Sequence, residues 1–138
     1  QDFVELEGDL LTHLAGIPGD DLDRLYALFV CAAAPARLGK PCRLVSDDPQ
    51  LARGTAVLCF LRRVAADQSG LASAQEYLYG VLLNALFRAM MLLNANDAGG
   101  KLLPALMLAS ILCYRLDHWQ ETWPPSGWPP VQLKNGSR

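Results

Sequence analysis

The sequence predicts an all-α fold, a compact bundle of about five antiparallel helices around a central apolar helix at about residues 74–93, with a Pro/Trp-rich C-terminal strap. Apolar residues recur at intervals of three and four along successive segments, which is the spacing of amphipathic helices. The connections between these segments are short, which favours antiparallel neighbours. Strand-like alternation is confined to the short stretch "CRLV". Because 51% of the 138 residues are hydrophobic, the chain can bury the core of one domain.

The first two helices are defined by their apolar stripes and by the breaker between them. Apolar residues at helical spacing from Phe3 to Leu14 predict the first helix, with three acidic residues, Glu7 among them, on the opposite side. The segment "GIPGDD" then breaks the helix, and Asp20 is the expected N-cap of the next one. This second helix is expected to continue to about residue 34.

The other three helices have clear start signals. Asp48 is the expected N-cap of a helix over about residues 49–67. A capping box at Ser73 begins the helix over about residues 74–93. That helix is apolar nearly all round, so we expect it at the centre of the bundle, surrounded by the others. The last helix is expected over about residues 102–120.

Charge and hydropathy argue against several classes of partner. Only 19% of the residues are charged and the net charge is −2, so the basic surface that binds nucleic acid is not expected. The longest apolar runs are about 13 residues, whereas a membrane span takes roughly 20. No membrane span and no secretory signal are therefore expected in these residues. Nine arginines against three lysines indicate GC-rich coding, as in vertebrates, many large DNA viruses and actinobacteria.

The four cysteines, Cys31, Cys42, Cys59 and Cys113, are scattered and form no C-x-x-C pair. Three of them lie in apolar helical patterns, where a free cysteine behaves as a small hydrophobic residue, and Cys42 lies in a loop. We therefore expect a reduced intracellular protein, cytoplasmic or nuclear. A disulfide-bonded protein is the alternative.

The sequence offers few residues for catalysis. Neither His13 nor His118 has a second ligand at metal-binding spacing, and phosphate-binding, dinucleotide-binding and nucleophile-elbow motifs are absent. We therefore expect no enzyme, no cofactor and no metal ion. The alternative is an enzyme or small-molecule binder with an inter-helix pocket, whose polar groups would come from Tyr77, Tyr79, Arg88 or Tyr114.

Basic residues form one candidate surface for a protein partner. Arg62 and Arg63, late in the third helix, would form a patch for an acidic segment together with Arg37, Lys40 and Arg43 of the preceding loop. The alternative is ordinary solvated charge. In either case, reversing the charges of Arg62 and Arg63 is expected to leave the domain folded.

The stretch "WPPSGWPP" follows directly on the last helical pattern. Its Pro-Pro pairs exclude both a helix and a central strand. Trp123 and Trp128, with Trp119 just before them, are expected to fold back between the helices. A linear ligand for a partner's groove is the alternative. We therefore divide the chain into a helical bundle domain, residues 1–121, and a C-terminal segment, residues 122–138, that packs back on the bundle and ends in a polar tail.

Together these features indicate a non-enzymatic helical interaction domain, an adaptor, scaffold or oligomerisation module of a larger intracellular protein. It would dock a partner helix or extended peptide in an apolar groove, or self-associate. Met90, Met91 and Met107 are typical of adaptable grooves, and equally of gap-filling in a core. A compact helical bundle with a central apolar helix resembles the Bcl-2-like group, although its Asn-Trp-Gly-Arg signature is absent here. As an alternative function, that resemblance implies a groove-binding regulator.

Overall fold

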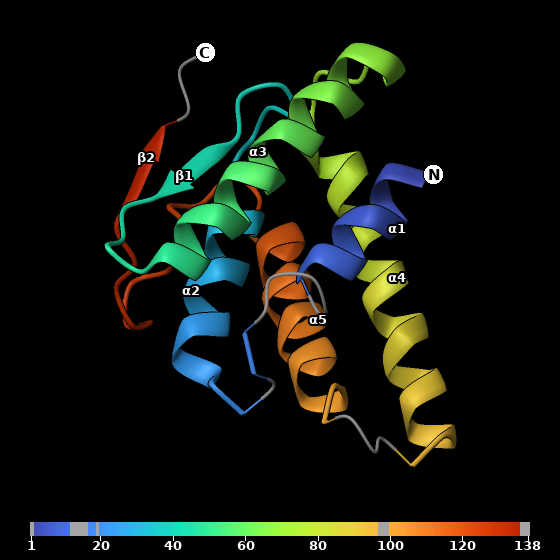
Figure 1. Cartoon of the computed structure of the whole chain (residues 1–138). Helices are drawn as coiled ribbons and strands as arrows, with labels where there is room; N and C mark the ends of the chain where they lie inside the picture. The colour runs from blue at the N-terminus through green and yellow to red at the C-terminus, as the bar shows by residue number, and fades with distance from the viewer. Residues whose placement is uncertain (1, 12–16, 19, 97–99, 136–138) are drawn as a thin grey trace.

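A computed structural model of the chain describes residues 2–11, 17–18, 20–96 and 100–135, and it confirms the predicted all-α bundle (Figure 1). Residues 12–16, which include His13 and the expected end of the first helix, lie outside the described residues. In chain order the elements are α1 (Asp2–Asp9), α2 (Leu22–Ala33), β1 (Cys42–Leu44), α3 (Pro49–Ser69), α4 (Ala74–Asn94), α5 (Leu102–Asp117) and β2 (Leu133–Asn135).

Local sequence signals set the helix ends. The Asp48 carboxylate accepts a hydrogen bond from the backbone N–H of Gln50 at 2.9 Å, and the Ser73 hydroxyl caps α4 in the same way. The cap of α2 is Asp21, one residue later than expected, because Asp20 belongs to the preceding turn. Gly70 ends α3 with a φ of 73°, a left-handed conformation that glycine adopts without steric cost.

The helix enclosed at the centre of the bundle is α2, whereas α4 was expected there. The six consecutive residues of α2 from Leu28 to Ala33 are all buried, because α3, α5, β1 and the C-terminal segment surround them. By contrast, α4 packs along α5 and α1 on one side only and forms one edge of the molecule (Figure 1). The expected central helix is therefore a peripheral helix with one exposed side.

The Pro/Trp-rich segment folds back on the bundle, as the preferred interpretation predicted. The Trp123 indole N–H donates to the carbonyl oxygen of Val30 at 2.9 Å, and the Tyr26 hydroxyl donates to the carbonyl oxygen of Pro129 at 2.9 Å. Residues Leu133–Asn135 of the segment form β2, which pairs antiparallel with β1, so that Lys134 lies opposite Arg43. This small sheet, absent from the prediction apart from "CRLV", lies across the molecule from α4 (Figure 1).

A buried arginine of α5 joins the C-terminal end of α2 to Trp119, just before the strap. Arg115 donates to the backbone carbonyl oxygens of Ala33, Ala34 and Trp119 at 2.8, 2.9 and 3.1 Å. Its guanidinium also lies over the Trp119 ring, 4.1 Å from the ring centroid. Since a helix leaves its last carbonyls without partners, this cation closes the C-terminal end of α2.

Candidate interaction surface

Nine of the thirteen large exposed apolar side chains among the described residues gather on one face of the bundle. Seven lie on the outer side of α4 and two on the neighbouring turns of α5, and each is between 41% and 66% exposed. We call this the α4–α5 face, formed by Tyr79, Leu83, Leu86, Phe87, Met90, Met91, Leu93, Leu103 and Leu106. A contiguous apolar patch of this kind is rare on a monomeric protein, so this face is the candidate interaction surface.

The face exists because α4 is apolar on both sides. Its inner side is buried against α5 and α1 through Leu78, Val81, Leu82, Ala85 and Ala89. The outer residues lie between these positions in the sequence and point away from the bundle. By length and composition α4 is the one described helix that could cross a membrane, and 33% of that apolar window is buried inside the fold.

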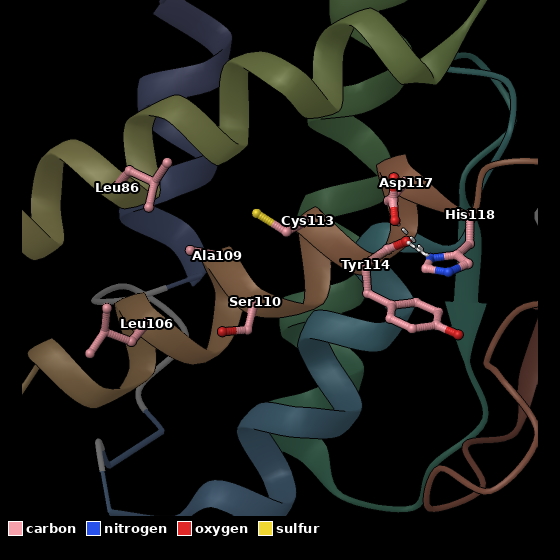
Figure 2. A pocket seen from close by; sticks show the side chains of 8 residues that line it. All are labelled: Leu86, Leu106, Ala109, Ser110, Cys113, Tyr114, Asp117 and His118. Carbon is pink, nitrogen blue, oxygen red and sulfur yellow. Dashed lines mark hydrogen bonds and ion pairs between the residues drawn. The ribbon is translucent and has the colours of Figure 1, made fainter.

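An open groove of about 550 Å³ runs between α4 and α5 (Figure 2). Leu86 of α4 and Leu106 of α5 lie at one end, and the side chain of Cys113 extends toward α4 (Figure 2). At the other end the His118 ring stacks on Tyr114, with ring centroids 3.9 Å apart. Besides these five, the lining residues are Ala109, Ser110 and Asp117. Most of the lining is apolar, so the groove extends the α4–α5 face inward.

A second, smaller groove of about 290 Å³ lies between α1 and α4. It is lined by Val4 and Glu5 of α1 and by Gly80, Leu83, Asn84 and Phe87 of α4. A Cβ at Gly80 would lie 3.1 Å from a Val4 methyl carbon, so glycine lets the two helices approach. Leu83 and Phe87 belong to both this groove and the α4–α5 face, which therefore continues to the edge of α1.

The methionines and tryptophans proposed as partner-binding residues differ in burial. Met90 and Met91 are half exposed on the α4–α5 face, whereas Met107 packs against the core. Trp119, Trp123 and Trp128 are partly buried against the core. The Trp123 and Trp128 rings lie edge to face, with centroids 5.4 Å apart. The strap is thus engaged by its own bundle.

The structure corrects the predicted basic patch. Arg62 is fully buried, and its Nε and Nη2 donate to the two carboxylate oxygens of Glu7 at 2.9 and 2.8 Å. Arg37, Lys40 and Arg43 are exposed and Arg63 is half-buried, so Arg62 belongs to the core and the other four to the surface. Reversing the charge of Arg62 would place two carboxylates side by side in the core, which contradicts the expectation that the double reversal leaves the domain folded.

Glu7 was also expected on the polar side of its helix, and it is fully buried. Burial works to lower the pKa of Arg62, but the Glu7 carboxylate outweighs it and holds that pKa above its ordinary value. The same ion pair lies beside Tyr77, whose ring centroid is 5.4 Å from the Arg62 guanidinium carbon. One signal was available: Glu7 lies four residues after Phe3 and three before Leu10, in register with the apolar stripe.

The cysteines are free; Cys31 and Cys59 are buried in their helices as expected, whereas Cys42 begins β1 and Cys113 is exposed. The thiols of Cys31 and Cys59 both donate to the carbonyl oxygen of Cys42, at 3.5 and 3.4 Å. Burial raises the pKa of all three thiols, that of Cys31 to about 12. Cys113 was expected on a buried stripe and is exposed instead, because it lies on the side of α5 that lines the groove.

The described residues provide few groups for catalysis. Among them, no three His, Cys, Asp or Glu side chains gather in a way that could hold a metal ion. Two of the four side chains proposed as polar groups of a pocket are engaged elsewhere: the Tyr77 hydroxyl donates to the carbonyl oxygen of Phe3, and Arg88 binds Asp9 at 2.7 Å. The Tyr114 ring is stacked on His118 at one end of the groove between α4 and α5. The fourth, Tyr79, is half exposed on the α4–α5 face.

Comparison of the chain with protein-family models, with curated proteins and with solved structures finds no match.

Proposed function

We propose that this chain is a non-enzymatic helical domain that binds a helix of another protein chain through its α4–α5 face. The observation that carries this proposal is the size of the apolar surface. Nine side chains about half exposed amount to something on the order of 1,000 Å², if a fully exposed large side chain counts about 200 Å². The largest apolar patch on a typical monomer is about 300–600 Å². A surface of this size favours a protein partner.

The shape of the face favours a helix over a small molecule. A small-molecule site encloses most of its ligand and offers a few converging polar groups. The groove between α4 and α5 is open, and its polar side chains are spread along it, from Ser110 to Tyr114 and His118, without converging on one point (Figure 2). An amphipathic helix laid on such a surface buries its apolar stripe and keeps its polar side in water.

In-cell photo-crosslinking tests this function. A photoreactive phenylalanine analogue replaces Phe87, which is 56% exposed on the face, or Phe60, which is 65% exposed on α3 and serves as the matched control. We expect a discrete protein adduct from position 87, none from position 60, and loss of the adduct when Leu83→Glu is added. The proposal fails if position 87 gives no discrete protein adduct, or if the same adduct forms from position 60.

A further inference from the structure

We propose that the partner helix is α4 of a second copy of this chain, so that two α4–α5 faces pack against each other about a two-fold axis. This inference rests on the proposed function, because it names the helix that the face binds. Three observations support it: the spacing of the exposed residues along α4, the absence of charge from the face, and its area.

The middle of the face has the spacing of a helix–helix seam. Tyr79, Leu83, Leu86, Met90 and Leu93 are separated by four, three, four and three residues, and each is 45% to 66% exposed. Alternate steps of three and four place side chains along one line of a helix, where they interlock with a second helix carrying the same pattern. The stripe covers 15 residues of α4, about 22 Å at 1.5 Å per residue.

The absence of charge favours a second copy over a charged partner. Between Tyr79 and Leu93, the stretch of α4 that carries the stripe, the one charged residue is Arg88; the exposed Glu76 lies before this stretch, in the first turn of the helix. Arg88 binds Asp9 of α1 at 2.7 Å and Asn84 of its own helix at 2.7 Å. A face without charge neither selects a partner of opposite charge nor repels its own copy, which is what a self-complementary interface requires.

The area of the face is what a stable dimer needs. Each partner in a standard protein–protein interface buries about 800 Å², and the α4–α5 face offers on the order of 1,000 Å². A two-fold pair uses the same surface on both copies, so the whole face is covered at once. Leu86 is the middle residue of the stripe, so it lies near its own copy whether the two helices run parallel or antiparallel.

The oligomeric state of the purified full chain tests the inference. Light scattering after gel filtration is expected to give twice the mass of the chain, with dissociation on dilution. Leu83→Glu is expected to weaken the dimer by at least about a hundredfold without changing the circular dichroism spectrum, because each copy would bury a charge in the seam. Phe60→Glu is the matched control, since both side chains are 65% exposed, and it should leave the dimer intact.

A cross-link locates the contact. In a Cys113→Ser background, Leu86→Cys is expected to form a disulfide-linked dimer on mild oxidation, whereas Phe60→Cys is not. A wild-type dimer that Leu83→Glu leaves intact, or equal cross-linking at both positions, would overturn the inference.

A monomer at every concentration would also overturn it. The proposed function survives that result if photo-crosslinking at Phe87 yields an adduct with a different protein, and it falls as well if no adduct forms. A wild-type monomer that sediments with neutral lipid vesicles, while Leu83→Glu stays in solution, would instead assign the face to a membrane surface.

Discussion

Removing the buried carboxylate of Glu7 should destabilise the fold more than removing any surface charge. Glu7 and Arg62 both have fully buried side chains, and two hydrogen bonds of 2.9 and 2.8 Å join them. The third guanidinium nitrogen with donor hydrogens, Nη1, is buried without a partner among the described residues. Glu7→Leu would therefore leave the Arg62 guanidinium buried without a carboxylate to pair with it.

The expected cost follows from this geometry. Breaking a buried ion pair by removing one partner costs about 3–5 kcal/mol, a large part of the ~5–15 kcal/mol by which domains are stable. Replacing both partners with apolar side chains of similar length removes the unpaired charge. The double variant Glu7→Leu with Arg62→Met should accordingly lie within about 2 kcal/mol of the wild type.

Urea unfolding followed by circular dichroism measures the stability of the wild type, the two single variants and the double variant, which together form a double-mutant cycle. We expect each single variant to lower the free energy of unfolding by about 3–5 kcal/mol and the double variant to restore most of it. Arg53→Met is the control, because Arg53 is exposed on α3, the helix that carries Arg62; this change should alter stability by less than about 0.5 kcal/mol. The reasoning is refuted if Glu7→Leu costs under about 1 kcal/mol, or if the two single effects simply add.

Three further predictions concern the strap, the cysteines and one helix cap. Trp123→Ala should lower the free energy of unfolding by about 2–4 kcal/mol and shift the remaining tryptophan emission to the red; an unchanged urea midpoint would contradict a packed strap. A thiol reagent should modify Cys113 first and Cys31 last under native conditions, because Cys113 is exposed and the pKa of Cys31 is raised to about 12; peptide mass spectrometry reads the order, and early labelling of Cys31 would contradict it. The hydrogen bond from Arg24 lowers the pKa of Asp48 in the folded protein. The ionised Asp48 carboxylate therefore stabilises the fold above its unfolded pKa of about 3.9, and this stabilisation is lost as the pH falls through the folded pKa. Asp48→Asn keeps the cap and removes the charge, so the melting temperature of this variant should fall less than that of the wild type between about pH 4 and pH 2, and equal slopes would refute the assignment.

The sequence alone was sufficient where a structure depends on neighbouring residues. Asp48 and Ser73 begin α3 and α4 as predicted, because an N-cap acts on backbone N–H groups two or three residues away. The direction of the strap was also predictable, since two tryptophans beside a helix end gain most by packing on that helix's neighbours. The helix count followed from the periodicity of the apolar residues.

Contacts between distant residues lay outside those local signals. Glu7 and Arg62 are 55 residues apart in the sequence. Taken separately, each is predicted to be a surface charge, and their pairing follows only from how α1 packs on α3. The pairing of β1 with β2 joins segments about ninety residues apart, and neither is long enough to be recognised as a strand by its own pattern. Arg115 likewise closes a helix whose last residue lies 82 positions earlier.

The position of α4 shows most clearly what the tertiary structure decided. Both sides of this helix are apolar, so periodicity predicts a buried helix and carries no information about which side the bundle covers. The inner side was selected by α5 and α1, which pack along Leu78, Val81 and Ala85. The five residues of the stripe on the outer side of α4 stay exposed, because no further helix of the described residues covers them. The sequence by itself therefore determined that α4 carries two apolar sides, and the packing of its neighbours determined which of them faces outward.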